Sequence, residues 1–316
     1  MQYIGIQSQI RKNNFRSVLL LVLFPCLVVG LTWLFFFIIS SSNADNQDYE
    51  ANHLVIASEM ALPAIPWVMG ACGIWFIIAY FANTTMIRNA THSHSLARKD
   101  NLRVYNLVEN LCISQGMKMP KINVIEDNSL NAFASGINDK TFTVTLTRGI
   151  INRLNDDELE GVIAHELSHI RNRDVRLLIV SIIFVGIFAF LSELLLRGAL
   201  SGAGRRRDND KGGGAIILVA LLVAALGYLL SSLMRFAISR KREFMADAGA
   251  AEMTRKPWAL ASALRKISYD PVVESVSRDD VAQLFIEHSS AAKGLAGSLF
   301  ATHPPIEKRI AVLEQF

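Results

Sequence analysis

Two histidines and a glutamate occur at a spacing that suits metal chemistry: His165, Glu166 and His169 form the pattern His-Glu-x-x-His. On a helix, side chains four positions apart project from neighbouring turns on one side, so both imidazole rings can reach a single Zn²⁺ ion. Glu166 then lies beside the metal, where it can accept a proton from a water molecule that the metal activates. The pattern fixes only three positions, so its meaning depends on the elements around it.

A catalytic zinc site needs a third protein ligand. Cys26, Cys72 and Cys112 are widely scattered and form no ligand pattern. Glu243 and Asp247 lie four positions apart in an expected helix. One of them could ligate the metal while the other holds a ligating histidine through its second ring nitrogen. An ordinary pair of surface carboxylates has the same spacing, so the residues alone leave both interpretations open.

The segment that carries His165 and His169 has the marks of an amphipathic helix. Asn155 and Glu158 have the spacing of a capping box, and acidic residues fill the first turn. Apolar residues then recur at helical spacing and predict one buried face: Leu159, Val162, Ile163, Leu167 and Ile170. Both histidines are therefore expected on a helix that is anchored in a folded domain.

The segments around this helix predict a small α+β domain. Residues 96–118 have the periodicity of a helix, with Leu102, Tyr105, Val108, Leu111 and Cys112 as its apolar positions. Residues 121–127 and 141–147 are typical of strands, and residues 131–140 between them suggest another strand followed by a turn. Three further helices are expected after the domain's apolar insertion, at residues 235–252, 257–269 and 304–315.

Apolar residues are gathered into blocks that indicate a membrane protein. Hydrophobic residues make up 51% of the chain and charged residues 19%, and residues 18–39 and 60–81 contain no charge. Each of these runs is long enough to cross a bilayer as a helix. A cleaved signal peptide is the alternative for the first run, but its apolar region is too long for one. Residues 177–196 and 215–234 are weaker candidates that either cross the membrane or form buried helices.

The distribution of charge predicts the orientation in the membrane. Arg11, Lys12 and Arg16 precede the first run, residues 40–59 are acidic without lysine or arginine, and basic residues return after the second run. Because basic loops stay on the cytoplasmic side, the His-Glu-x-x-His segment is expected in the cytoplasm. The net charge of +4 comes from basic residues that cluster beside apolar segments. This placement suits a lipid surface as partner and not nucleic acid.

These patterns divide the chain into four parts. Residues 1–82 would form an N-terminal tail and a two-helix membrane anchor, and residues 83–176 the first part of a cytoplasmic domain. Residues 177–234 would form an apolar helical hairpin, and residues 235–316 the second part of the domain, which contains the candidate third ligand. The expected fold class is a mainly α integral-membrane protein with transmembrane helices and an α+β domain that contains a small β-sheet; the resemblance described next implies that this domain is a zincin-like metallopeptidase domain.

Four motifs in order resemble the HtpX family of membrane zinc endopeptidases, which are relatives of the type I prenyl-protein proteases and the Oma-type proteases. The motifs extend over residues 131–136, 165–174, 242–247 and 302–309. The resemblance covers nearly the whole chain. It implies one Zn²⁺ per chain, with His165, His169 and Glu243 as ligands.

The resemblance also implies roles for other residues. Glu166 would be the general base, and Asp247 would support a ligating histidine. Asn131, Ala132 and Phe133 would pair with a substrate held as an extended strand. His303 and Arg309 would approach the cleft, or else cap the last helix or pack against acidic residues.

The function implied by this resemblance is a multi-pass protease of the bacterial inner membrane. Its substrates would be polypeptides, above all misfolded or damaged membrane proteins, and its active site would face the cytoplasm. One alternative is a peptidase that processes a specific membrane-associated precursor. Another is a non-catalytic membrane scaffold with a vestigial zinc site, although such a scaffold has no need for Glu166. The oligomeric state is left open.

Overall fold

The computed structural model describes residues 6–42, 53–180, 182–183, 186–188, 220–229, 241–270, 285–286 and 304–316 of the 316-residue chain. The chain divides into two compact units. One unit combines Met1–Arg16, Ala82–Ile179 and Phe236–Phe316, and the other combines Ser17–Phe81 and Val180–Arg235. Each unit is therefore built from segments that lie far apart in the sequence.

The second unit contains the apolar helices. Among the described residues, two helices are long and apolar enough to cross a membrane: Ser17–Ser41 within α1 (Ile6–Ser42), and α2 (His53–Ala90). Large apolar side chains of α2 face outward, with Trp67 81% and Phe81 80% exposed, as suits contact with lipid. The uncharged runs at 18–39 and 60–81 lie within these two helices. The two weaker candidates were residues 177–196 and 215–234. Within the second of them Ala220–Leu229 forms a short apolar helix, and most of residues 177–234 lies outside the described residues.

The first unit contains a four-stranded mixed sheet in the order β1-β2-β4-β3. Its strands are β1 (His94–Ser95), β2 (Lys121–Ile125), β3 (Ala132–Ser135) and β4 (Thr143–Thr147). β2 and β4 are parallel, whereas β3 pairs with β4 antiparallel and forms an edge of the sheet. Strands were predicted at the positions of β2, β3 and β4. The two-residue β1 and the short helix α4 (Arg148–Arg153) were not predicted.

The turn between β3 and β4 depends on glycine. Gly136 has φ +110°, and a Cβ atom there would lie 2.4 Å from the carbonyl oxygen of Thr141. Only glycine adopts this conformation and tolerates this approach. The residue therefore fixes the hairpin that places β3 at the edge.

The helix α3 (Leu102–Ser114) is shorter than the predicted 96–118. Asn101 begins it, since its side chain accepts a hydrogen bond from the Val104 amide, and Gly116 with φ +61° follows its end. Of the five predicted apolar positions, Leu102 is exposed and Val104 is buried in its place. The prediction was wrong there because Asn101 begins the helix, so that Leu102 is its first residue and lies off the face formed by Val104, Val108, Leu111 and Cys112.

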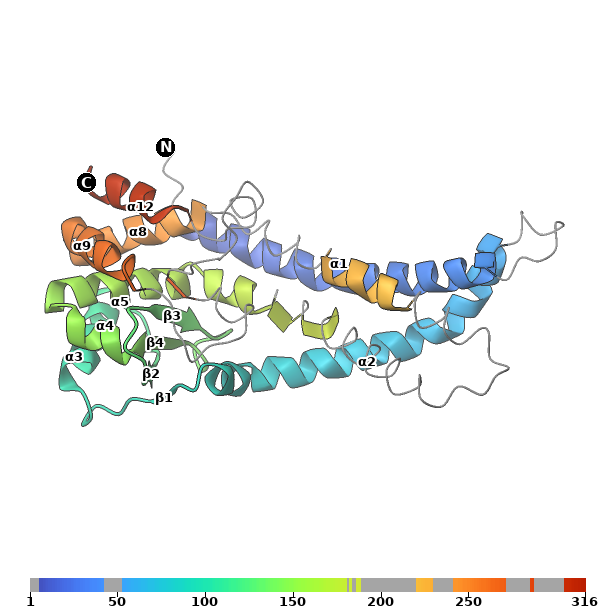
Figure 1. The fold of residues 1–316 in the computed structure, drawn as a ribbon, viewed down its shortest axis with the longest axis horizontal. Helices are drawn as coiled ribbons and strands as arrows, with labels where there is room; N and C mark the ends of the chain where they lie inside the picture. The colour runs from blue at the N-terminus through green and yellow to red at the C-terminus, as the bar shows by residue number, and fades with distance from the viewer. Residues whose placement is uncertain are drawn as a thin grey trace. The chain divides into compact units, whose positions relative to one another are not determined.

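α5 (Asp156–Arg171) is the central helix of the first unit. The predicted capping box is confirmed: the Asn155 side chain accepts from the Glu158 amide, and the Glu158 carboxylate accepts from the Asn155 amide. The predicted apolar face is buried throughout. α5 packs against β3 and β4 of the sheet, and also against α3, α8 (Lys241–Thr254) and α9 (Pro257–Ile267) (Figure 1). The last helix, α12 (Ile306–Leu313), packs on α8 and α9.

Two glycines allow close packing against α5. A Cβ at Gly161 of α5 would lie 3.2 Å from the backbone of Leu260 in α9. A Cβ at Gly249 of α8 would lie 2.3 Å from the Oγ of Ser168 in α5. The second distance is far below van der Waals contact, so with Ser168 in this rotamer the space between α8 and α5 accommodates glycine and no larger residue at position 249.

Replacing Glu158 with Gln should destabilise the first unit. Glu158 is buried, and its Oε2 accepts from the Asn155 amide at 3.0 Å and from Lys266 Nζ at 2.6 Å, while Oε1 accepts from Ser262 Oγ at 2.7 Å. A glutamine carries no charge, so its hydrogen bond with Lys266 is no longer charge-assisted, and its NH₂ group can be accommodated only if the Ser262 hydroxyl turns from donor to acceptor. We expect a loss of about 2 kcal/mol of stability at pH 7, measured by thermal unfolding of the full chain in detergent.

The pH dependence of this loss follows from the pKa of Glu158. Burial alone would raise that pKa, but the hydrogen bonds from Lys266, Ser262 and the Asn155 amide outweigh burial and lower it. A lowered pKa contributes stability above the ordinary glutamate pKa of about 4.3, and this contribution disappears as the pH falls through the folded-state value. The difference between wild type and Glu158→Gln should therefore be constant from pH 7 to 5 and shrink below about pH 4. As a control, Glu109→Gln removes one partner of an exposed ion pair with Arg98, so its stability should differ little from that of the wild type at any pH.

Replacing Gly249 with Ala should force α8 away from α5. Overpacking of this kind costs about 1–3 kcal/mol, which a lower midpoint of thermal unfolding would report. Removing the Ser168 Oγ in a Ser168→Ala, Gly249→Ala double variant should recover most of the loss. Ser168→Ala alone should be nearly neutral, because this buried Oγ has no hydrogen-bond partner among the described residues. Equal loss in the single and double Gly249 variants would contradict the packing argument.

Candidate metal centre

α5 presents His165, Glu166 and His169 toward the interior of the first unit. His165 is 1% exposed and Glu166 2% exposed, and the side chain of His169 is 12% exposed. Because the histidines are four positions apart, their rings project from successive turns of the same face. The ring centroids are 4.7 Å apart and the ring planes are nearly perpendicular. The capped start of α5 and its buried apolar face fix this orientation.

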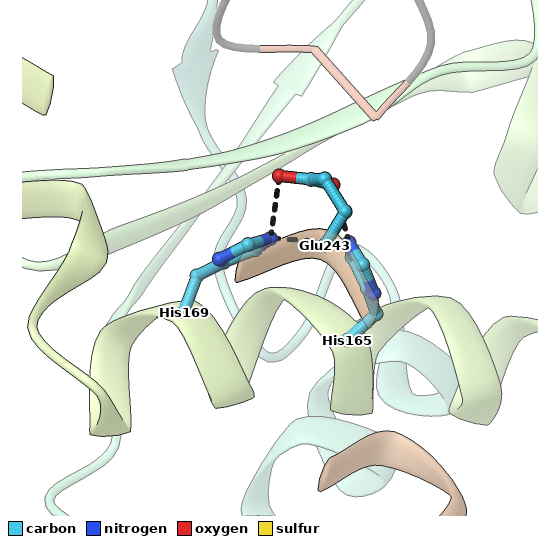
Figure 2. Close-up of side chains that lie close together, drawn as sticks. All are labelled: His165, His169 and Glu243. Carbon is cyan, nitrogen blue, oxygen red and sulfur yellow. Dashed lines mark hydrogen bonds and ion pairs between the residues drawn. The ribbon is translucent and has the colours of Figure 1, made fainter. Parts of the chain in front are cut away.

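α8 brings a carboxylate to the two histidines. Glu243 is 3% exposed, its Oε1 is 3.7 Å from the Nε2 of His169, and its Oε2 is 3.7 Å from the Nε2 of His165. Figure 2 shows the three side chains converging from α5 and α8. One donor atom from each residue lies within 4.8 Å of the other two, so this group could hold a metal ion. It is the one such group among the residues that the structure describes.

The outer nitrogens of both rings are bound to carboxylates. His165 Nδ1 is 2.9 Å from Oδ1 of Asp247, and His169 Nδ1 is 3.2 Å from Oδ2 of Asp174. A carboxylate accepts hydrogen bonds, so each Nδ1 must carry the proton. Each neutral ring then keeps a lone pair on Nε2, the tautomer that a ligating histidine needs.

The two Nε2 atoms face each other at 3.2 Å. With both Nδ1 atoms protonated, a pair this close requires a positive charge between the rings. Either a proton bound to His169 supplies it, as the raised pKa of that ring indicates, or a metal cation that also meets the Glu243 carboxylate supplies it. Two imidazoles and one carboxylate are also a donor set that catalytic zinc sites use. The residues present therefore fit a bound zinc ion.

Buried charges perturb the groups of the centre. Burial alone would lower the pKa of His169, but the charge of Glu243 and the hydrogen bonds to Asp174 and Glu243 raise it to about 10. Burial would raise the pKa of Asp247, but the charge of Arg309 and the hydrogen bonds from His165 and Arg309 lower it to about 2. At neutral pH Asp247 is therefore ionised, and the carboxylates around His169 favour a positive charge there, either a proton on the ring or a metal cation.

Glu166 lies in the same electrostatic environment but outside the group of three donors. Burial raises the pKa of Glu166, the charge of Glu243 acts in the same direction, and the two histidines oppose this shift. A raised pKa improves a carboxylate as a proton acceptor near neutral pH. Its electrostatic interactions with His165, His169 and Glu243 put Glu166 near the three donors, and its role as the base stays a prediction.

Arg309 reaches the centre from α12. Its side chain is fully buried, and its guanidinium donates to Asp247 through Nε at 2.9 Å and through Nη2 at 2.7 Å. Arg309 thus packs against an acidic residue, one of the two expectations, and it also lies 3.4 Å from His165 Nε2; whether it approaches a substrate cleft stays a prediction. His303 lies outside the described residues.

The residues expected to bind substrate lie at the edge strand. Asn131, Ala132 and Phe133 are all buried, and the Asn131 side chain accepts a hydrogen bond from the Ala132 amide at 3.0 Å. The Ala132 carbonyl accepts from the amide of Ile286 at 2.8 Å. The rings of Phe133 and Phe285 are in edge contact, with centroids 4.9 Å apart. Part of this edge is thus covered by the chain itself.

Asp174 is a residue of the centre to which the sequence analysis gave no role. It is 2% exposed and holds His169 as Asp247 holds His165. It follows His169 by five positions, just beyond the end of α5, and Arg173 before it has φ +63°. The proximity of an acidic residue to the second histidine was the available signal, but the interruption of the helix at Arg173, which decides where the Asp174 side chain lies, could not be read from the sequence.

Comparison with known proteins identifies the family of the chain. Residues 98–316 match peptidase family M48. A protease HtpX homologue of Bacteroides fragilis is 60% identical over 323 residues, which cover 100% of both chains. One of Lactobacillus helveticus is 33% identical over 320 residues, which cover 98% of this chain and 99% of that protein. Among solved structures, S. mikatae Ste24p matches with a TM-score of 0.45 and 20% identity, over 96% of this chain and 66% of that one.

The family match includes all three donor residues and Glu166, and the relatives match over the whole chain. The resemblance to HtpX proteases that the motifs indicated is thereby confirmed. The chain belongs to peptidase family M48 and is a membrane-bound metalloendopeptidase.

Proposed function

We propose that the metal is zinc, one ion per chain, and that His165, His169 and Glu243 hold it while Glu166 acts as the general base. One observation carries this proposal: two Nε2 atoms and a carboxylate converge, and both Nδ1 atoms are bound to carboxylates. A site with this arrangement is ready to bind a metal without rotating either ring.

The chemistry divides between the metal and the chain. Bound zinc would lower the pKa of a water molecule toward neutrality and polarise the peptide carbonyl. Glu166 would accept the proton of that water and deliver it to the leaving amine. Asp247 and Asp174 would keep both histidines in the ligating tautomer throughout the cycle.

We further propose that an extended substrate pairs with the outer edge of β3. An edge strand offers unpaired backbone groups to another chain, and backbone pairing tolerates many substrate sequences. The position of β3 at the edge and its packing on α5 support this proposal. The amide of Ile286 already binds Ala132, so a substrate that extends this far would have to replace it.

The cellular role that fits these features is the degradation of misfolded or damaged membrane proteins in the bacterial inner membrane. α1 and α2 would span the bilayer, and the charge distribution would place the centre on the cytoplasmic side. A processing peptidase for one membrane-associated precursor is the second candidate. Comparing cleavage of unrelated unfolded membrane proteins with cleavage of defined precursors separates the two. Broad cleavage supports quality control.

Replacing Glu166 with Gln should abolish proteolysis and leave the metal bound. The substitution removes the proton acceptor and leaves His165, His169 and Glu243 unchanged. We expect wild-type zinc content by elemental analysis, and a loss of casein cleavage and self-cleavage of at least about 100-fold, the usual scale of general-base catalysis. Glu243→Ala is the matched comparison, since it should lose zinc as well as activity. A Glu166→Gln protein that still cuts casein would refute the assigned base.

The orientation can be tested with single cysteines. In a chain whose Cys26, Cys72 and Cys112 are replaced, Asp45→Cys should react with a membrane-impermeant maleimide in spheroplasts. Lys118→Cys should react only in inverted vesicles, because residues 83–176 are proposed to be cytoplasmic. Labelling of Lys118→Cys in spheroplasts would contradict the orientation.

Asn209→Cys tests the topology of the apolar hairpin. If residues 177–234 cross the membrane twice, this cysteine should be labelled in spheroplasts.

A further inference from the structure

The buried guanidinium of Arg309 is linked through one carboxylate to a donor of the metal centre. Asp247 binds two of its nitrogens, and the Asp247 Oδ1 that accepts from Arg309 Nη2 at 2.7 Å also lies 2.9 Å from His165 Nδ1. The chain of contacts therefore runs from α12 through α8 to α5. A bidentate pairing between arginine and a carboxylate fixes the carboxylate in position and in rotation.

The remaining contacts of Arg309 also lie within the centre. Nη2 is 3.5 Å from Nδ1 and 3.4 Å from Nε2 of His165, and Nη1 is 3.8 Å from Oε2 of Glu243. Nη1 donates to the Ile286 carbonyl at 3.2 Å. All three guanidinium nitrogens are thus engaged by groups of the chain itself.

Charge explains why such an arginine is needed. Four buried carboxylates surround the two histidines: Glu166, Asp174, Glu243 and Asp247. A divalent cation would balance only part of this charge. A buried carboxylate without a cation nearby is strongly destabilised, so Asp247 needs a positive partner in order to remain an acceptor for His165.

On the basis of the proposed function, we infer that Arg309 is a positioning residue of the metal centre. It fixes the position and rotation of Asp247 through two hydrogen bonds, Asp247 holds His165 in the ligating tautomer, and the centre is complete only while α12 is docked. Arg309 acts through Asp247 and does not touch the substrate. The nitrogens that could stabilise a developing charge on the substrate are already bound to the chain.

Zinc affinity tests this inference. We would measure it by competition with a chromophoric chelator on the full chain in detergent, with Glu166→Gln present to prevent self-cleavage. Arg309→Gln should bind zinc 10–100-fold more weakly, the range found when a partner of a ligating histidine is lost. Lys308→Gln removes an exposed positive charge from the neighbouring position of α12 and should bind zinc as the parent does. Unchanged affinity in Arg309→Gln would overturn the inference.

A double variant shows whether Arg309 acts through Asp247. Asp247→Asn and Arg309→Gln each leave one buried charge without its partner, whereas the double variant removes both. The loss of affinity in the double variant should therefore be much smaller than the product of the two single losses. Losses that multiply would mean that the two residues act independently, and would overturn the inference.

Measuring kcat and KM for casein cleavage, in chains that keep Glu166, separates a positioning role of Arg309 from a purely structural one. Arg309→Lys keeps the charge but not the bidentate pairing. It should fold, bind zinc with intermediate affinity, and lower kcat while KM for casein is unchanged. Wild-type zinc affinity and kcat in Arg309→Lys would also overturn the inference. The wild-type chain serves as the reference. If it neither binds zinc nor cleaves casein, the proposed function is wrong, and the inference about Arg309 is wrong with it. If the wild type does both and only the Arg309 variants behave differently from expectation, the inference alone is wrong.

Discussion

The approach of α8 to α5 is the constraint on which the metal centre depends. The histidines belong to one helix and Glu243 to the other, and the Nε2 atoms of the histidines are held 3.2 Å apart in a buried space. No local sequence preference brings these groups together. Gly249 permits the close contact between the helices, and β3 and β4 of the sheet also pack against α5. A metal ion held by the three donors would relieve the cost of confining them in this space.

Features that depend on neighbouring residues could be predicted from the sequence. The capping box of Asn155 and Glu158, the buried face of α5, and strands at β2, β3 and β4 follow from spacings within a few residues. The pairing of His165 with His169 is also local, because helical geometry fixes it. Glu243 could be suggested as a ligand from spacing, but the resemblance to a family was needed to choose it over Asp247.

Features that depend on packing could not be predicted in this way. The periodicity of residues 96–118 did not reveal that Asn101 would start α3 late and leave Leu102 exposed. Asp174 lies beyond the end of its helix, where no periodic rule applies. The position of Arg309 was ambiguous, because only the contact between α12 and α8 decides that its guanidinium meets Asp247.

The hydrogen bond from the Ile286 amide to the Ala132 carbonyl has a consequence for solubility. A short strand at the edge of a sheet exposes backbone groups that can pair with the same strand of another molecule, which leads to aggregation. All four residues of β3 are buried, and the Ala132 carbonyl is occupied by the chain's own amide. The hydrogen bond from Ile286, which a substrate would have to displace, therefore also disfavours edge-to-edge pairing of β3 between two molecules when no substrate is bound.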